Sequence, residues 1–342
     1  MRISRKKIAL ILCISLFCCS LLQGCQRPDK TVEKYGFYFD TIINITLFGD
    51  YEESLIDDCF ALAQECENLF SNTISSSDIS KINDNPGEFV TVDPRTVDIL
   101  QKAIAYGDFS QGIFDITIGK LVDLWNISEL SKQEDNSDFD KSILPAQEDI
   151  ANVKKNINYK AVIIDGTSVQ LASTDCKIDL GGIAKGYIAD LMKEFLMEQG
   201  VTSACISLGG NILTIGEKPN HNPFKIGIQK PFSDRNDVIG TVNVKDKSVV
   251  TSGIYERYIK VNDTIYHHIL DKSTGCPVEN ELLEVTIISN QSIDGDALST
   301  ICFLLGTEKG MEYIEALEDV EAVFVDRDYQ ITTTSGVDLQ IP

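Results

Sequence analysis

Basic residues and histidine are both scarce in this chain. Lysine and arginine number 30 against 52 aspartates and glutamates, so the 342 residues carry a formal net charge of −22. An acidic chain of this kind repels the phosphate backbone of nucleic acid, and we expect no nucleic-acid partner. The histidines are His221, His267 and His268. A catalytic imidazole base would have to be one of these three.

The N-terminal apolar run is too short to span a membrane. It covers residues 8–22, fewer than the roughly 20 residues that a spanning helix needs. Basic residues precede it and Gly24-Cys25 follows it, as in a lipoprotein signal peptide. We therefore predict a signal peptide over residues 1–24, a diacylated Cys25, and a tether over residues 25–36. The protein would be lipid-anchored to the cell membrane on its extracytoplasmic side, and an uncleaved anchor would also leave the domain outside the membrane.

Cysteine pairs with metal-ligand spacing are absent. Three of the ten cysteines lie in the signal peptide and Cys25 takes the lipid, which leaves six with no CxxC pair. Cys59 and Cys66 are seven positions apart in a predicted helix, where about 10 Å of rise is too far for a disulfide. Thiolate metal ligation is therefore disfavoured, and small buried apolar side chains are the better interpretation.

The chain also lacks a Pro/Ser-rich linker or an internal repeat, so residues 37–342 are predicted to form one domain. A strand is expected over residues 37–48, and helices over residues 55–70 and 94–106, the second capped by Asp93. Turn residues predict β-hairpins over residues 162–171, 255–269 and 322–332. The acidic residues 129–140 are typical of an exposed insertion. The predicted class is α+β, a single compact domain with largely antiparallel β-sheets flanked by helices.

Residues 179–186, with the sequence DLGGIAKG, form the most informative segment. They place a carboxylate, two glycines and Lys185 directly before an amphipathic helix that ends near Gly200. Backbone N–H groups and the positive end of the helix dipole meet at such a turn, where an anion can bind. A glycine pair before a helix more often serves ordinary packing or turn formation, however. Other segments have to decide between a packing role and an anion site.

Three further segments narrow the interpretation. Asp296 and Thr300 are four residues apart, which puts two hard oxygen donors on one face of a helix. The alternative is that Asp294 or Asp296 caps the helix that runs to Gly306. The other two segments are residues 251–258 (TSGIYERY), continued by residues 267–277, and residues 207–211 (SLGGN).

In this order, the four segments resemble the FAD:protein FMN transferases of the ApbE family. The resemblance runs from about residue 39 to the C-terminus, and four ordered motifs are more specific than one glycine pattern. It implies a compact fold with central β-sheets and a phosphoryl transfer that depends on Mg²⁺. FMN would pass from FAD to a threonine hydroxyl of an acceptor protein, a membrane redox protein in this family, with release of AMP.

The resemblance also implies roles for individual residues. Mg²⁺ would be held by Asp296, Thr300 and the backbone carbonyl of Gly182. FAD contacts carry over to Ile113, Phe114, Asp115, Asp179, Lys185 and Leu270. Taken without the family, Phe114 would be a core residue, and Lys185 would be either a solvated lysine of its helix or an anion contact beside the glycine turn.

The chain departs from the family pattern near its start. Many relatives have Met-Gly-Thr where this chain has Phe39, Asp40 and Thr41, and an aromatic position corresponds to Thr73. The flavin contacts that relatives make there are not expected in the same form.

Strand alternation separates the adjacent histidines. His268 would share a face with Leu270 while His267 points away, so His268 is the candidate base, with Asp296 as a carboxylate alternative. A core histidine is the structural alternative for His268. Two rival functions remain open at this point, an FAD pyrophosphatase that releases FMN and AMP, and a non-catalytic flavin-binding lipoprotein.

Overall fold

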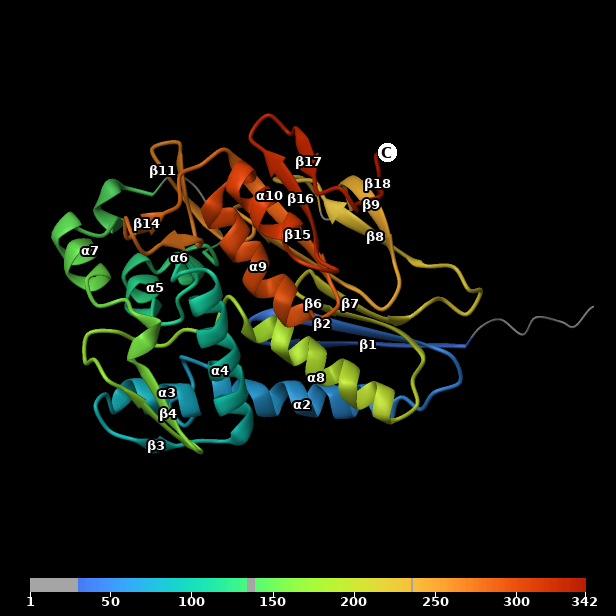
Figure 1. Ribbon diagram of the computed structural model, residues 1–342, viewed down its shortest axis with the longest axis horizontal. Coiled ribbons are helices and arrows are strands. Elements are labelled where there is room, and N and C mark those ends of the chain that lie inside the picture. Colours follow the sequence, from blue (N-terminus) through green and yellow to red (C-terminus); the bar gives the residue numbers. More distant parts are fainter. Residues whose placement is uncertain (1–29, 134–138, 235) are drawn as a thin grey trace, which may run out of the picture.

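A computed structural model describes residues 30–133, 139–234 and 236–342 (Figure 1). The predicted signal peptide and Cys25 lie outside the described residues, as does part of the acidic segment 129–140. Within the described ranges, no helix has the length and apolar character needed to cross a membrane.

The central element is an eight-stranded sheet whose neighbouring strands are all antiparallel. Its order is β1 (Thr31–Tyr38), β2 (Thr41–Phe48), β6 (Ser203–Leu208), β7 (Asn211–Gly216), β10 (Ser248–Gly253), β15 (Leu282–Ser289), β16 (Glu321–Asp326) and β17 (Ile331–Thr333). β15 is buried along its whole length, as expected for a central strand covered on both faces.

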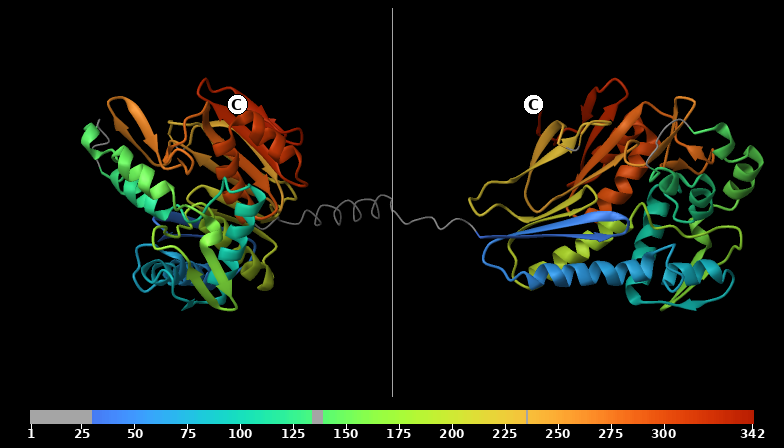
Figure 2. Two further views of the ribbon diagram at one scale, coloured as in Figure 1. Left: turned by 60° about the vertical axis from the view of Figure 1, so that its left-hand side comes forward. Right: turned by 180° about the vertical axis from the view of Figure 1, so that it is seen from behind.

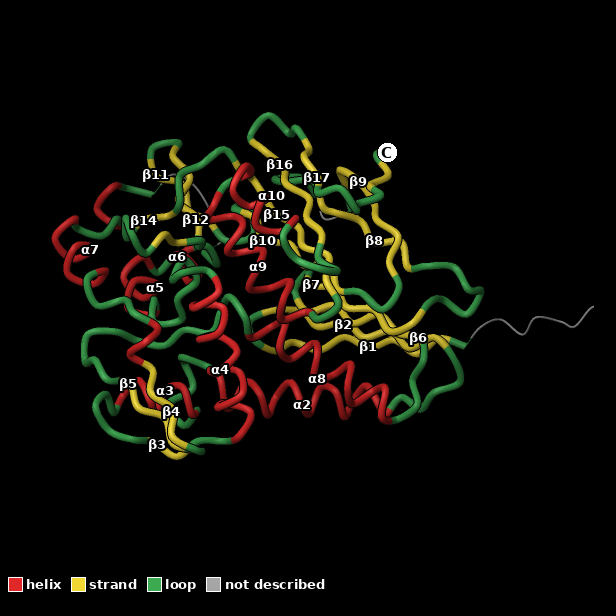
Figure 3. The backbone as a smooth tube through the Cα atoms, viewed as in Figure 1, coloured by secondary structure: helices red, strands yellow, loops and turns green. Residues whose placement is uncertain are grey.

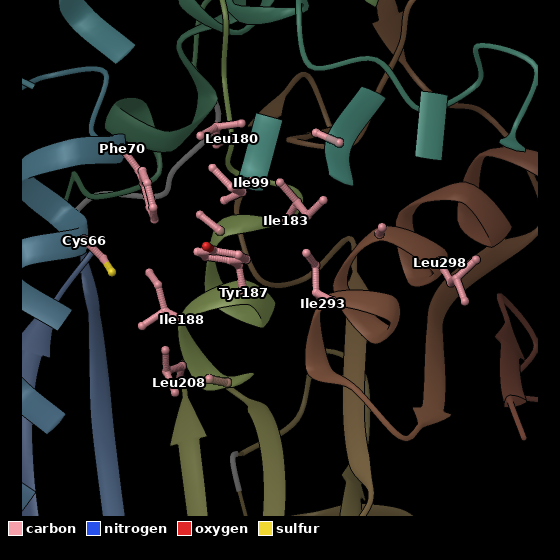
Figure 4. Close-up of a cluster of buried hydrophobic side chains, with 14 of the residues drawn as sticks. Cys66, Phe70, Ile99, Leu180, Ile183, Tyr187, Ile188, Leu208, Ile293 and Leu298 are labelled. Atoms are coloured by element: carbon pink, nitrogen blue, oxygen red, sulfur yellow. The ribbon is translucent and has the colours of Figure 1, made fainter. Parts of the chain in front are cut away.

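Helices cover one face of this sheet. They are α2 (Ser54–Phe70), α8 (Ala184–Glu198), α9 (Ser292–Leu305) and α10 (Thr307–Glu315), and the apolar residues of α4 (Pro94–Phe109) join the same core. α8 contacts β6 and β7, and α9 contacts β10 and β15, while α2 lies against β1 and α8. Their apolar faces form the main core, part of which is drawn in Figure 4, where Tyr187, Ile188 and Ile293 come together from α8 and α9. Figure 2 shows from behind that β1 and β2 lie over α2.

A three-stranded sheet covers part of the opposite face. It consists of β18 (Leu339–Gln340), β9 (Val238–Val244) and β8 (Phe224–Gln229). Phe224 and Val242 of this sheet form a second apolar cluster with Val249, Ile288 and Val323 of the main sheet. Figure 3 shows β8 and β9 on the side of the main sheet away from α2 and α8.

Shorter elements build the end of the molecule that holds the cavity described below. They are α3 (Asp78–Asp84), α5 (Gly119–Trp125), α6 (Ile127–Leu130), α7 (Gln147–Lys154), the 3₁₀ turns Lys141–Ile143 and Tyr159–Ala161, and the strands β3 (Val90–Thr91), β4 (Val162–Asp165), β5 (Ser168–Leu171), β11 (Tyr258–Val261), β12 (Thr264–His267), β13 (Leu270–Asp271) and β14 (Cys276–Pro277). Leu121, Trp125, Ile259 and Leu270 pack in a third cluster that joins α5 to the β11–β14 region.

Most local predictions are confirmed. α2 and α4 match the two expected helices, and the Asp93 side chain accepts a 2.8 Å hydrogen bond from the backbone N–H of Arg95, as an N-cap should. The three expected hairpins are β4–β5, β11–β12 and β16–β17. The α+β class with antiparallel sheets is confirmed too. All six described cysteines are free, and four of them are buried.

The predicted single strand over residues 37–48 is wrong. The chain instead forms a hairpin of β1 and β2 that turns at Phe39 and Asp40, both of which have positive φ values, 53° and 56°. Neither residue is the glycine or asparagine that marks such a turn, so the sequence pattern predicted one continuous strand. β1 begins at Thr31, which places residues 31–36 in the sheet rather than in the tether assigned to residues 25–36.

Candidate active site

Asp179 organises the glycine turn before α8. Its two carboxylate oxygens accept hydrogen bonds from the Gly181 backbone N–H and from the Asn72 side chain, each at 2.7 Å. Surrounding protein raises the pKa of Asp179 above its ordinary value, and these two bonds oppose the shift. The turn is therefore built around a carboxylate, and the predicted helix follows it from Ala184.

Asp296 approaches this turn from α9. Its side chain is only 5% exposed, and it accepts hydrogen bonds from the Gly186 N–H and the Asn211 amide, each at 3.0 Å. The Lys185 ammonium lies 3.6 Å from the same carboxylate. The first turn of α8 thus donates its Gly186 N–H to a protein carboxylate, so this N–H is not free for a phosphate as the sequence suggested. A bound anion would need a cation between itself and Asp296.

The sequence alternative that Asp294 or Asp296 caps α9 is wrong. α9 begins at Ser292, and the backbone N–H groups of Ser292 and Ile293 donate to the Asp190 carboxylate of α8 at 2.7 and 2.9 Å. Burial raises the pKa of Asp190 to about 6. Asp296 is therefore available for another role.

Gly182 and Thr300 complete the oxygen donors around Asp296. A Cβ atom on Gly182 would lie 3.3 Å from the Phe114 ring and 3.8 Å from the Thr300 hydroxyl. Thr300 donates a 3.3 Å hydrogen bond to the backbone carbonyl of Asp296. In the described part of the chain, no three His, Cys, Asp or Glu side chains converge as metal ligands. One carboxylate, one hydroxyl and one backbone carbonyl nevertheless fit Mg²⁺, which keeps several positions for water and substrate phosphates.

Residues 113–115 form another wall, and Asp115 has a structural role there. Its side chain is 1% exposed, and its carboxylate accepts hydrogen bonds from the backbone and hydroxyl of Thr117, from the Tyr159 N–H and from the Lys272 ammonium, at 2.7 to 3.1 Å. Phe114 is buried, with its ring edge-on to Tyr106. The Asp115 oxygens are therefore already engaged, and an FAD contact at this residue would involve its backbone.

The two adjacent histidines differ as expected, although no continuous strand joins them to Leu270. His267 is buried, where it hydrogen-bonds the Val278 carbonyl at 3.1 Å and packs edge-on against Phe303. His268 follows the end of β12 and lines the cavity together with Leu270. His221 lies elsewhere, exposed, against Glu217.

His268 is held as one tautomer. Its Nδ1 lies 3.2 Å from the Arg257 carbonyl, which can only accept, so Nδ1 carries the proton and Nε2 has a free lone pair. Surrounding protein, Arg257 and Lys185 lower the pKa of His268 to about 3, which keeps the imidazole neutral at pH 7.

Residues from the glycine turn, α9, residues 113–115 and the segment after β12 border one cavity of about 210 Å³. The predicted residues among its lining are Ile113, Phe114, Asp115, Asp179, Gly182, Lys185, His268, Leu270, Asp296 and Thr300. Of the departures from the family pattern, Phe39 and Thr73 are described residues and do not belong to that lining. Asp40 forms a 2.9 Å ion pair with Lys132 at the tip of the β1–β2 hairpin.

Sequence reasoning did not assign three polar residues of the site. Glu256 and Arg257 line the cavity, and Asn211 binds Asp296. The surrounding protein raises the pKa of Glu256 to about 7, although Lys185 and Arg257 act to lower it. All three lie within the motifs 251–258 and 207–211, so the signal was present, but their direction toward the cavity was not visible in the spacing.

Comparisons with known proteins identify the family of the chain. The ApbE family model matches residues 39–324. An FAD:protein FMN transferase of Klebsiella pneumoniae (strain 342) is 38% identical over 288 residues, which cover 83% of this chain and 86% of the relative. An FAD:protein FMN transferase of Treponema pallidum (strain Nichols) is 31% identical and covers 82% of this chain and 80% of its own length.

Solved structures give the same result for the fold. The ApbE protein of Thermotoga maritima MSB8 superimposes with a TM-score of 0.79 at 30% identity and covers 90% of this chain and 97% of its own. The flavin transferase ApbE of Vibrio cholerae has a TM-score of 0.78 at 24% identity, with 90% and 98% covered, and supports the fold alone.

Proposed function

The chain belongs to the ApbE family, and on that premise we propose that it is an FAD:protein FMN transferase. The observation that carries the proposal is the single cavity in which Asp179, Lys185, His268, Asp296 and Thr300 meet. These groups supply oxygen donors, a cation and an imidazole acceptor at one place, which transfer of a phosphoryl group requires.

The proposed reaction is a substitution at the FMN phosphorus of FAD. A threonine oxygen of the acceptor protein forms a new P–O bond, and the bond from that phosphorus to the bridging oxygen breaks. The bridging oxygen leaves with its electron pair as part of AMP. The threonine proton passes to a base in the cavity.

The chain's own residues position and neutralise the reacting groups. Lys185 and Arg257 offer positive charge beside the anionic pyrophosphate. Asp296, Thr300 and the Gly182 carbonyl would hold Mg²⁺, which supplies charge neutralisation and alignment of phosphate oxygens when bound. Asn211 and the Gly186 N–H hold the Asp296 carboxylate in place.

His268 is the proposed base. Its neutral tautomer presents Nε2 as a proton acceptor, whereas the donated Nδ1–H fixes the ring to the Arg257 carbonyl. Its low pKa makes it a weak base without substrate. An anionic pyrophosphate beside Lys185 and Arg257 would offset their positive charge and raise the pKa of His268 toward a useful range.

The site of action is proposed to be the extracytoplasmic face of the cell membrane. This part rests on the sequence pattern at residues 1–25, with the lipid on Cys25. The acceptor would then be a redox protein of the same membrane that carries a target threonine.

The test incubates the protein lacking residues 1–24 with FAD, Mg²⁺ and an acceptor already modified by a related enzyme. Flavin fluorescence that stays with the acceptor on a denaturing gel is the expected result. Free FMN with AMP and an unlabelled acceptor would instead identify an FAD pyrophosphatase, and unchanged FAD would identify a flavin-binding protein without catalysis. Asp296→Ala should abolish labelling, whereas the matched control Asp294→Asn, on the same helix outside the cavity, should retain it.

A further inference from the structure

Glu284 is a buried carboxyl group that the proposed reaction does not use. It lies in β15 directly after a β-bulge between Leu282 and Glu284, and its residue exposure is 0%. Bulges redirect side chains next to functional sites. Its Oε2 accepts a 2.6 Å hydrogen bond from the Tyr255 hydroxyl, and its Oε1 has no hydrogen-bond partner.

This environment favours the neutral form of the carboxyl group. An ionised carboxylate without a cation costs several kcal/mol in a protein interior, and protonation removes that penalty. Burial raises the pKa of Glu284 to about 8, while the Tyr255 hydrogen bond acts to lower it and the charge of Glu256 acts to raise it. Within the described ranges, Tyr255 and Glu256 are the titratable groups that act on Glu284.

Tyr255 connects Glu284 to the cavity. Its ring packs against Gly253, where a Cβ would approach the ring to 2.5 Å, and lies edge-on to Phe232. The next two residues, Glu256 and Arg257, line the cavity.

The same segment sets the position of His268. The Arg257 carbonyl accepts hydrogen bonds from both the backbone N–H and the Nδ1 of His268, at 3.1 and 3.2 Å. Hydrogen bonds therefore join Glu284 to Tyr255 and Arg257 to His268, and the backbone joins Tyr255 to Arg257 through Glu256.

We propose that Glu284 is a positioning residue for the transfer reaction, which holds the Tyr255–Arg257 wall and through it His268, and that it does so as an uncharged acid. The inference rests on the proposed function for its kinetic readout. When Glu284 ionises, the buried charge draws solvent toward its unpartnered Oε1, and the wall loses its fixed position. Transfer then falls although no residue that touches FAD has changed.

The sign of the pH effect follows from the raised pKa. The folded-state pKa lies above the ordinary value of 4.5, so this group contributes stability fully below pH 4.5 and loses it as the pH rises through about 8. Ionisation in the folded protein should reduce single-turnover transfer by about tenfold for each pH unit above 8.

The decisive experiment compares the wild type with Glu284→Gln, which keeps the shape and lacks the ionisation. We expect Glu284→Gln to transfer FMN at near wild-type rate at pH 7, with unchanged KM for FAD, and to lack the alkaline decline. The free energy of unfolding of Glu284→Gln should also decrease by less than that of the wild type between pH 5 and pH 8. Glu284→Ala should be slow at every pH, because it no longer holds Tyr255.

Other results would overturn the inference. An alkaline decline that is identical in the wild type and Glu284→Gln would show that Glu284 does not control the wall. If Glu284→Gln does not fold, Tyr255→Phe decides. It removes the hydroxyl through which Glu284 holds the wall, so transfer should be slow at every pH and lack the alkaline decline, and a wild-type rate with an unchanged decline refutes the inference. A wild-type protein that never labels the acceptor refutes the proposed function instead, and the unfolding measurements still test the protonation of Glu284.

Discussion

Gly186 is the position where a single methyl group should do the most damage to the site. It lies in the first turn of α8, directly against the start of α9. A Cβ atom there would lie 2.4 Å from the Ser292 carbonyl oxygen and 2.7 Å from the Ile293 Cα atom, both in the backbone of α9. Because real Cβ contacts essentially never fall below 3.0 Å, Gly186→Ala must push the two helices apart.

Two effects of this substitution oppose each other. Alanine stabilises a helix interior by about 1 kcal/mol relative to glycine. Overpacking against a backbone that cannot rotate away costs about 1–3 kcal/mol or more, and a weakened hydrogen bond from the Gly186 N–H to the charged Asp296 costs about 1.5–3 kcal/mol. The clash should win, and we expect Gly186→Ala to lower the free energy of unfolding by about 2–4 kcal/mol.

The assay is urea unfolding at pH 7, combined with a Mg²⁺ titration followed by calorimetry. Glu194→Ala, at an exposed position of the same helix, is the control and should change stability by less than about 0.5 kcal/mol. Gly186→Ala should also bind Mg²⁺ more weakly, since Asp296 moves with α9. A Gly186→Ala protein as stable as the wild type, with unchanged Mg²⁺ affinity, would refute the close-packing argument.

Three further predictions concern the metal, the base and the anchor. Asp296→Ala or a chelator should abolish transfer, whereas Thr300→Ala should weaken it, because a carboxylate attracts Mg²⁺ more strongly than a hydroxyl. Calorimetry with Mg²⁺ alone should show a larger loss of affinity in Asp296→Ala than in Thr300→Ala. Full transfer by Asp296→Ala in excess chelator would eliminate this metal site. His268→Ala should slow single-turnover transfer by about 10²-fold or more with FAD affinity largely intact, and His267→Ala should do neither; equal defects would contradict the assignment. Cys25→Ser should leave the membrane fraction with its activity retained, and unchanged membrane retention would disprove lipid anchoring.

Local sequence patterns were sufficient for much of the fold. Asp93-Pro94 marked the start of α4, and Asn262-Asp263, both with positive φ, marked the β11–β12 turn. The turn at Phe39 and Asp40 was missed because phenylalanine rarely adopts a left-handed conformation, and Asp40 has no neighbouring asparagine or glycine to strengthen the turn signal. Patterns of this kind report backbone preferences within a few residues, which is why they succeed for capped helices and regular hairpins.

The sequence predicted which residues belong to the site, but it did not predict the contacts that these residues make. The motifs contained Asp179, Asp296 and His268, and all three border the cavity. What the chain does with Asp115 was hidden, because its partner Lys272 is 157 positions away. Glu284 was equally hidden, since a glutamate within an apolar strand gives no sign of the tyrosine that covers it.

Each of the helices α8 and α9 accepts backbone hydrogen bonds from the start of the other through a carboxylate. These reciprocal bonds affect the order in which the protein can fold during synthesis. Asp190 of α8 receives the first N–H groups of α9, and Asp296 of α9 receives an N–H from the first turn of α8, across 102 to 110 positions of sequence. Neither helix start is satisfied until the other has been synthesised. A nascent chain that ends before residue 292 therefore has an uncovered α8 and lacks Asp296 and Thr300, two of the three proposed Mg²⁺ ligands. FAD binding should appear abruptly, late in translation, rather than grow with chain length.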